Sequence, residues 1–404
     1  MPLEHFGHLN EPNPINPLLD RKLKTCGLYT QVVGANGNQL HCGDDKLVLD
    51  FVPGHGCLPL GHGPNPVAET VAETLKLPLT NLVQPYFSEA TEVLARRLMS
   101  LSPIITERVN FATTGTEAIE IALNSARLAT GRLRFIAAVN GTHGKSIGGL
   151  SVTHTDPVNE FAELAGTVFV PFGDIDAMDR ALAAEGDSMA AVILEPVQSE
   201  GGVKLASQAS FEAVRALCYK HSVLLIHDEI MTGTGRTGHF FATEWTGGNP
   251  DIIVLGKALG GGVMPISACL LGPRAVTKSL DFQQMSSFAG SAYAATAANA
   301  MLDVLLENDS ELLRSIRACG NTLDGIHQRL QRAYPELIAD TRGCGLLHGI
   351  EFSRQTNVVA GSEGAFLGLA GSSQQYPALT AGHMLSNGVR VTPAANCKGV
   401  LRIM

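Results

Sequence analysis

Short apolar runs alternate with helical patterns along the chain from about residue 65 to residue 310. Clear examples of the runs are RFIAAV (134–139), AAVILEPV (190–197), VLLIH (223–227) and DIIVLG (251–256). They are apolar throughout rather than at every second position, which indicates strands that are covered on both faces. Because such strands alternate with helices, we predict an α/β fold with a mostly parallel central sheet.

The pattern changes on both sides of this region. Residues 1–60 are irregular and interrupted by Pro and Gly, and we expect them to contribute to a small domain. Residues 61–310 are predicted to form the large domain, and residues 311–404 the C-terminal part of the small domain. That part opens with a long amphipathic helix pattern at 311–334 and closes with short strands within 387–404. The Gly/Ser-rich stretch 359–378 is predicted to be a surface loop.

The composition narrows the class of protein. The net charge of −9, with no basic face to compensate it, argues against nucleic acid as a partner. No apolar run is long enough to cross a bilayer, and the first residues lack the features of a signal peptide. The eight cysteines form neither a C-x-x-C motif nor a metal-binding spacing, so we predict no metal site. These features favour a cytoplasmic enzyme with reduced thiols and no membrane contact.

Ligands of such sheets bind at the carboxyl ends of the strands, and three motifs are expected there. In FATTGTEAIEIAL (111–123) a strand is predicted to end at Ala112 and a helix to open near Thr116. The first N–H groups of a helix suit a phosphate, Gly115 permits close approach, and the hydroxyls of Thr114 and Thr116 can donate to it. The alternative is that Thr116 only caps the helix.

The other two motifs place an acid and a lysine at strand ends. Asp228 follows VLLIH, where a carboxylate can bind a positively charged ring nitrogen or, alternatively, be satisfied by neighbouring backbone N–H groups. Lys257 lies between IIVLG and ALGGG, and a lysine in apolar surroundings has a lowered pKa and can act as an amine nucleophile. A phosphate site, an acid for a ring nitrogen and such a lysine together indicate pyridoxal 5'-phosphate (PLP) chemistry.

The segment from His227 to Gly262 resembles the class III (ω-amino acid type) aminotransferases of fold type I. It carries D-E, the loop T-G-x-G-R-T-G, P-D, and a strand that ends in G-K-A-L-G-G-G. The resemblance covers nearly the whole chain, because other segments match family patterns: LGHGPNPVAETV (60–71), TTGTEAIEIALNSARLATGR (113–132), ILEPVQSEGGV (193–203, against E-P-x-Q-G-E-G-G) and RGCGLLHGIEF (342–352). It implies a large PLP-binding domain with a smaller α+β domain built from both chain ends.

The resemblance also implies a role for each matching residue. Lys257 is implied to form the Schiff base with PLP and to move the proton, and Asp228 to pair with the pyridine nitrogen. The phosphate would be held by Thr114, Gly115 and Thr116, and by Ser287 from the other subunit of an obligate homodimer with shared active sites. The remaining implied positions are Thr142, His143, Glu195 and Gln198 beside the cofactor, and Lys145, Glu200 and Arg402 towards the substrate.

The sequence departs from the family pattern at four places. Thr142 stands where an aromatic residue usually stacks on PLP, so either His143 or another ring compensates, or the cofactor face is looser. The alternative for His143 is an ordinary structural histidine. Lys145 replaces an arginine that binds a substrate carboxylate, and it offers a point charge in place of a planar fork. Met231 replaces a common glutamine. The chain ends at Met404, before the P-P-L and last helix of the family, so the small domain is expected to be incomplete.

The predicted function is a PLP-dependent aminotransferase that moves an amino group between an amine or an ω- or β-amino acid and a carbonyl acceptor. A glutamate-semialdehyde-type aminomutase is an alternative, because its D-E-V-M-T-G motif is close to DEIMTG (228–233) here. Decarboxylase and racemase chemistry on the same fold stay open. A protein that has become a PLP-fold binding module is disfavoured, because Lys257 and Asp228 are both present.

Overall fold

A seven-stranded sheet forms the centre of the region predicted to be the large domain. The computed structural model describes residues 15–25, 27–43, 45–63, 65–82, 86–277, 286–353, 376–397 and 399–404. The strands of the central sheet are β4 (Arg108–Ala112), β5 (Arg134–Ala138), β6 (Val168–Val170), β7 (Met189–Leu194), β10 (Leu224–Asp228), β11 (Ile252–Leu255) and β12 (Ser267–Leu271). Their order is β4-β12-β11-β10-β7-β5-β6. The strand β12 runs in the opposite direction to the other six, which are parallel to one another. The predicted, mostly parallel sheet is confirmed.

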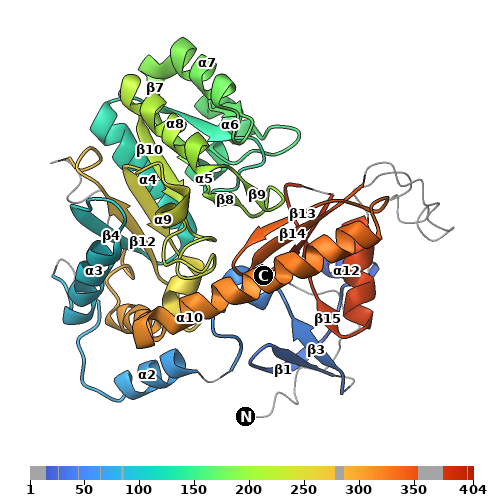
Figure 1. Cartoon of the computed structure of the whole chain (residues 1–404). Helices are drawn as coiled ribbons and strands as arrows, with labels where there is room; N and C mark the ends of the chain where they lie inside the picture. Colours follow the sequence, from blue (N-terminus) through green and yellow to red (C-terminus); the bar gives the residue numbers. More distant parts are fainter. Residues whose placement is uncertain are drawn as a thin grey trace.

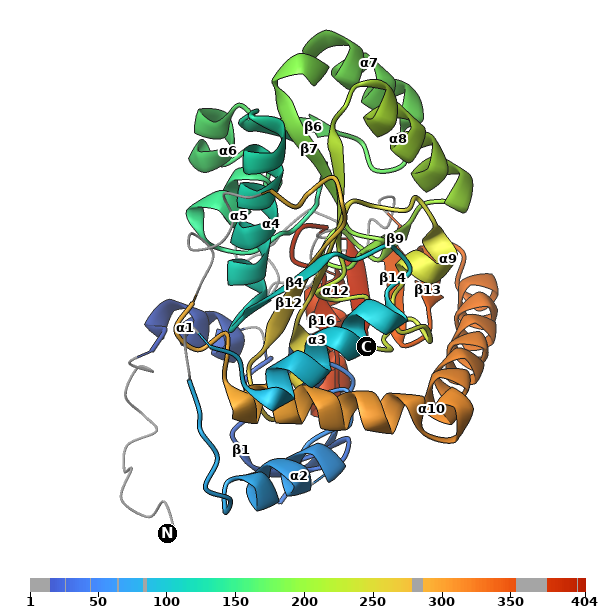
Figure 2. The same cartoon turned by 90° about the vertical axis from the view of Figure 1, so that its left-hand side faces the viewer.

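Helices cover both faces of this sheet, which explains why its strands are apolar at consecutive positions. Ile252 and Val254 of β11 pack in the cluster that contains α4 (Gly115–Thr130). Ile253 and Leu255 point to the other face and pack with α3 (Glu89–Leu101) and α10 (Ala292–Ala333). Figure 2 shows α4 on one side of the sheet and α8 (Gln208–Lys220) on the other.

The remaining described helices surround these layers. They are α1 (Pro17–Thr25), α2 (Pro66–Thr74), α5 (Ile147–Ser151), α6 (Glu160–Ala165), α7 (Ile175–Glu185), α9 (Thr243–Thr246) and α12 (Tyr376–Ser386). Short 3-10 turns occur at Pro53–Gly56, Gly186–Ser188 and Lys257–Gly260. Within the described residues, no helix is both long and apolar enough to cross a membrane.

The long segment α10 connects the large domain to the C-terminal strands (Figure 1). Its first half packs on α2 and α3, and its second half packs on β13 (Ile338–Cys344). The backbone leaves the helical conformation at Glu307, and residues 308–310 have φ between 48° and 60°. This break coincides with the predicted boundary at residues 310/311, although the division into domains itself stays a prediction.

Both ends of the chain build the smaller sheets, as expected from the resemblance. One sheet has the order β1-β2-β3-β15, and in it β3 pairs in parallel with β15 from the C-terminal part. The second sheet has the order β13-β14-β17-β16. Strands β8 and β9 form a two-stranded hairpin. The bounds are β1 (Val32–Asn36), β2 (Gln39–Cys42), β3 (Leu47–Asp50), β8 (Val197–Gln198), β9 (Lys204–Leu205), β14 (Leu347–Phe352), β15 (Val389–Arg390), β16 (Thr392–Pro393) and β17 (Val400–Ile403).

Two further expectations concern the ends of elements. The alternative interpretation, in which Thr116 caps the helix after β4, is wrong, because Thr114 is the N-cap of α4. The Thr114 hydroxyl accepts the N–H of Glu117, whose carboxylate accepts the N–H groups of Thr113 and Thr114, so the two side chains form a capping box. The predicted surface loop at 359–378 lies largely outside the described residues.

Candidate active site

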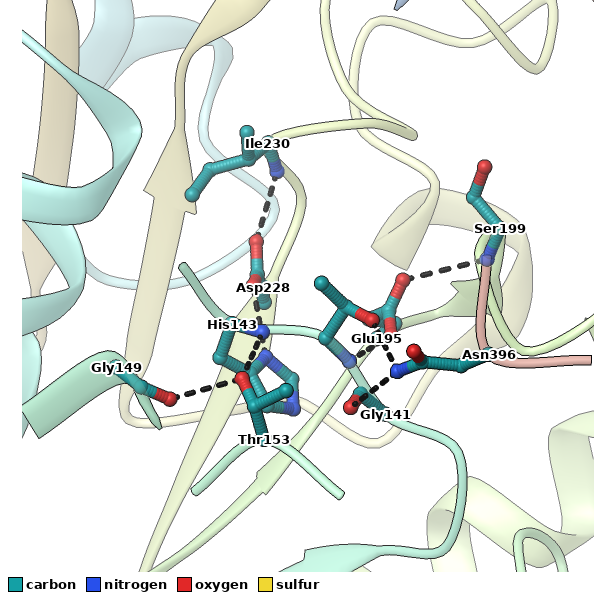
Figure 3. A network of polar contacts seen from close by, with 10 residues as sticks. Gly141, His143, Gly149, Thr153, Glu195, Ser199, Asp228, Ile230 and Asn396 are labelled. Atoms are coloured by element: carbon teal, nitrogen blue, oxygen red, sulfur yellow. Dashed lines mark hydrogen bonds and ion pairs between the residues drawn. The ribbon is translucent and has the colours of Figure 1, made fainter. Parts of the chain in front are cut away.

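Asp228 lies at the carboxyl end of β10, in the middle of the central sheet, and is 4% exposed. Its Oδ1 accepts the backbone N–H of Ile230 at 3.0 Å, and its Oδ2 lies 2.8 Å from Nδ1 of His143 (Figure 3). A carboxylate has about four positions at which it can accept a hydrogen bond. Asp228 is therefore oriented from two sides and retains capacity for a further donor.

His143 is buried beneath this carboxylate and is held by its own loop. Its backbone N–H donates to the Thr153 hydroxyl at 2.8 Å, and that hydroxyl donates to the carbonyl of Gly149. Burial lowers the pKa of His143, but the hydrogen bond and charge of Asp228, together with the charge of Glu195, outweigh it and raise the pKa above its ordinary value. Asp228 and Glu195 thus favour the protonated form of His143 more than water does.

Lys257 begins a 3-10 turn directly after β11 and has a φ of 45°, which is unusual for a residue with a side chain. Such backbone conformations occur where the surrounding structure holds a functional side chain in place. Burial lowers the pKa of its ammonium, and this outweighs the negative charges of Asp228 and Glu200 nearby. The contact described for its Nζ is the sulfur of Met231, at 3.8 Å. Lys257 therefore has the properties of an amine nucleophile.

The start of α4 lies beside these strand ends. Gly115 and Thr116 are the first two helical residues, so their N–H groups have no carbonyl one turn earlier to bind. A Cβ on Gly115 would lie 2.9 Å from the side chain of Ile230, and a Cβ on Gly144 would lie 2.9 Å from the Thr116 hydroxyl. Glycine at these positions lets the backbone segments meet closely around the helix start.

The loop between β5 and α5 is held by the residues that follow β7. Glu195 accepts the N–H of Thr142 at 2.9 Å and the N–H of Ser199 at 3.2 Å. Burial raises the pKa of Glu195 to about 7. Gln198 donates to the carbonyl of Val139 at 3.0 Å, while its buried Oε1 has no partner among the described residues.

Glu200 and Arg402 form an ion pair next to this loop. Arg402, on β17, is 1% exposed and donates from Nη1 to Glu200 Oε1 at 2.5 Å and to the Ser199 hydroxyl at 2.8 Å. Burial raises the pKa of Glu200, but the charge of Arg402 and the N–H of Ala395 outweigh it, so the net pKa is lowered. The pairing of Glu200 with Arg402, implied by the resemblance, is present in the structure.

Three residues at the site were not singled out from the sequence. Ser199 stands where the family pattern has glycine, and this difference was a readable signal. Asn396 reaches the loop at Thr142, and no local pattern announces it. Arg236, in the Gly/Thr-rich loop after β10, donates to the carbonyl of Gly56 at 3.3 Å. Burial lowers its pKa to about 10.

Other predicted positions behave differently. Lys145 is exposed, and its side chain forms no hydrogen bond or ion pair with the part of the chain that the structure describes. Ser287 is also exposed, in the turn before α10. Glu229, for which no chemistry is expected from the sequence, is fully buried and accepts the N–H groups of Ala242 at 2.6 Å and Thr243 at 2.8 Å. These contacts fit a structural role.

The residues present fit PLP. The acid at the ring-nitrogen position is buried, oriented and able to accept another donor, as described above. The buried Gln198 Oε1 and His143 Nε2 have no partner among the described residues and remain for a ligand or water. Among the residues that the structure describes, no carboxylate binds Lys257, and the start of α4 offers free N–H groups for a phosphate.

Comparison with known proteins supports this assignment. The family model for class-III aminotransferases matches residues 24–400. The aminotransferase PigE of Serratia sp. (strain ATCC 39006) is 35% identical over 361 residues, which are 87% of this chain and 41% of PigE. This chain therefore spans less than half the length of that relative.

Solved structures agree with the family. Ornithine aminotransferase from Toxoplasma gondii ME49 is 25% identical with a TM-score of 0.78, covering 93% of this chain and 85% of the other. A PLP-bound amine transaminase from an uncultivated Pseudomonas species is 25% identical with a TM-score of 0.80, covering 99% and 93%. The predicted fold type I architecture is confirmed, and PLP is the cofactor of this family. The chain belongs to the class III aminotransferase family.

Proposed function

We propose that this chain is a PLP-dependent aminotransferase that moves an amino group between an amine or amino acid donor and a carbonyl acceptor. The observation that carries the proposal is the arrangement at the ends of β10 and β11: a lysine with a lowered pKa beside a buried carboxylate that a histidine orients. Because PLP chemistry requires an amine and an acid for the ring nitrogen, this pair has the required parts.

Each side chain has a task in this proposal. Bound PLP supplies an electron sink for the charge left when the substrate carbon loses its proton. Asp228 holds the ring nitrogen, and His143 orients Asp228 and balances its charge. Lys257 would hold the cofactor through Nζ, and its amine would move the proton of the substrate carbon. Gly115 and Thr116 hold the phosphate with their N–H groups.

The substrate side of the proposal rests on the pair Glu200–Arg402. Glu200 and Ser199 accept from Nη1 of Arg402, and the carboxylate of Glu200 balances the charge of the guanidinium, so a substrate carboxylate has to compete with Glu200 for Arg402. We therefore expect substrates without a carboxylate next to the reacting carbon, such as ω-amines and aldehydes, to react faster than α-amino acids. Lys145 is the other cation assigned to the substrate, and its exposed position suits a carboxylate at the far end of a longer substrate.

The proposal includes a cytoplasmic homodimer in which Ser287 reaches the phosphate of the partner's site. Large apolar side chains are exposed in one stretch: Leu75, Leu77, Leu79, Tyr86 and Phe87. Exposed apolar surface of this kind favours an interface. Sedimentation of the purified protein tests the point, and a monomer at micromolar concentration that binds PLP normally contradicts the shared site.

The aminomutase alternative keeps one observation in its favour. Met231 corresponds to the methionine of the aminomutase motif D-E-V-M-T-G, and its sulfur contacts Nζ of Lys257. The two candidates differ in stoichiometry, since a mutase converts one amino aldehyde without a second substrate. Turnover of an amino aldehyde alone supports the mutase, whereas product formation that requires both donor and acceptor supports the transferase.

The main experiment follows the absorbance of the protein reconstituted with PLP while a panel of amines and amino acids is added. We expect the visible band of lysine-bound cofactor to disappear with a reactive donor and to return with a carbonyl acceptor. Lys257→Ala should abolish the band and turnover, while Lys220→Ala, at an exposed lysine, should change neither. Turnover that persists in Lys257→Ala, or no response to any donor, contradicts the proposal.

A further inference from the structure

A loop near the C-terminus crosses the active site at the point where this chain lacks the usual aromatic residue. We propose that Asn396, on this loop, is a positioning residue: its side-chain amide holds the Thr142 loop and thereby the orientation of His143 beside Asp228. This inference rests on the proposed function, because it assigns the support of the residues that hold PLP. Figure 3 shows Asn396 reaching the loop that carries His143.

Among the described residues, the side-chain amide of Asn396 binds groups at 141–142 and at His154, where the chain returns past this loop. Nδ2 donates to the Thr142 hydroxyl at 2.8 Å and to the carbonyl of His154 at 3.0 Å, and it lies 3.4 Å from the carbonyl of Gly141. Carbonyl oxygens only accept hydrogen bonds, so the nitrogen of the amide must face them. The N–H of His154 also donates to the carbonyl of Gly141, so the side-chain amide of Asn396 binds the two loop segments where they already meet.

Glu200 fixes the other side of Asn396. The N–H of Asn396 donates to the carbonyl of Glu200 at 2.9 Å, and the N–H of Ala395 donates to the Glu200 carboxylate, also at 2.9 Å. The same carboxylate pairs with Arg402. Asn396 therefore lies between the ion pair assigned to the substrate side and the loop assigned to the cofactor side.

The contacts continue from Thr142 to the ring-nitrogen acid. The N–H of Thr142 donates to Glu195, and the next residue, His143, is fixed by its N–H to Thr153 and by its ring to Asp228. The hydroxyl of Thr142, at the position where the family usually has an aromatic residue, is thus the group through which Asn396 holds this loop. Loss of the amide frees Thr142 on one side while Glu195 still holds its backbone, so we expect a shifted His143 rather than an unfolded loop.

The test uses the full chain reconstituted with PLP, compared with Asn396→Ala, Asn396→Asp and Thr142→Val. Two properties are measured: the rate at which PLP is released into an excess of a trapping protein, and the pH at which the absorbance of lysine-bound cofactor changes. Asn387→Asp is the matched control, because it makes the same change at an exposed residue just after α12. The side chain of Asn387 bonds to His383 and Ser386 of that helix.

Asn396→Ala removes two good hydrogen bonds, and we expect release about ten times faster, with a shifted pH midpoint. Asn396→Asp should be worse, since it turns carboxylate oxygens towards two carbonyl oxygens. Thr142→Val keeps the shape and removes one acceptor, so its effect should be smaller and should largely disappear in the Asn396→Ala background.

The inference is overturned if both Asn396 variants have the release rate and pH midpoint of wild type. It is also overturned if the effects of Thr142→Val and Asn396→Ala are fully additive. If an Asn396 variant does not fold, Thr142→Val tests the same hydrogen bond from the other side. This outcome can be told apart from failure of the proposed function. If the protein binds PLP but reacts with no donor, the aminotransferase proposal is contradicted, and the comparison of release rates still decides the role of Asn396. Wild-type protein that binds no PLP overturns both.

Discussion

The hydrogen bond between His143 and Asp228 allows a sharp test of the proposed chemistry. The test replaces His143 by Asn, which can still offer a neutral N–H donor, and by Phe, which offers none. In the native protein the two atoms are 2.8 Å apart, and both side chains are buried. Replacement by Phe leaves the Asp228 Oδ2 without its partner at the place where the ring nitrogen is to be held.

The expected loss follows from the type of bond. A hydrogen bond between charged groups contributes about 1.5–3 kcal/mol, which corresponds to about a tenfold to hundredfold change in a rate or equilibrium constant. We expect kcat/KM of His143→Phe to fall by about that factor, and that of His143→Asn by less, because the neutral donor remains. Thermal unfolding of each variant separates this effect from a general loss of stability.

The pH dependence gives an independent check. Burial lowers the pKa of His143, but Asp228 and Glu195 raise it above its ordinary value of 6.5. For a group whose folded pKa is raised, the contribution is complete at low pH and is lost as pH rises through the folded pKa. The wild-type profile of kcat/KM should therefore carry a falling limb above pH 6.5 that is absent in His143→Asn.

An exposed histidine supplies the control. His383→Asn, on α12, should keep both the rate and the falling limb of the wild type. If His143→Asn retains the limb unchanged, or if His143→Phe is as active as wild type, then His143 does not act as the cationic partner of Asp228.

Three further predictions concern stability, cofactor binding and thiol reactivity. Asp251→Asn should lower the free energy of unfolding by about 3–5 kcal/mol, measured by chemical denaturation, because it breaks a buried pair with one arginine and a contact with another. Gly115→Ala should weaken PLP binding, measured by fluorescence titration, since its Cβ would lie 2.9 Å from an isoleucine, whereas Gly290→Ala meets nothing within 4 Å and should bind normally. A thiol reagent should modify exposed Cys319 first and leave Cys218 unmodified in the folded protein, because burial raises the pKa of Cys218 to about 12; mass spectrometry of the labelled protein would show the opposite order if this is incorrect.

The central sheet was predictable because its strands must be apolar on both faces. Every apolar run quoted from the large domain became a strand of that sheet, since a helix lies on each side of it. Asp228 and Lys257 could be chosen for the same reason: a charged residue directly after such a strand needs a partner or a function. Their positions at neighbouring strand ends follow from the pairing of β10 with β11.

The rest of the site was less accessible. The cap considered as an alternative was placed at Thr116, although the pattern of Thr114 and Glu117, three residues apart, was readable and forms the capping box. Asn396 could not be found, because it bonds to Thr142 across 254 residues, and nothing in its local sequence sets the register of that contact. Long-range hydrogen bonds between loops depend on the whole fold, whereas strands and caps depend on neighbours in the chain.

The pairing of β3 with β15 has a consequence for how this chain is made. Leu49 pairs with Val389, and Asp50 pairs with Arg390 both in the strand register and through its carboxylate. During translation the first residues leave the ribosome long before residue 390 is synthesised, and domains generally fold as units while the chain emerges. The edge of β3 that pairs with β15 must therefore stay unpaired until residues 389 and 390 have been produced.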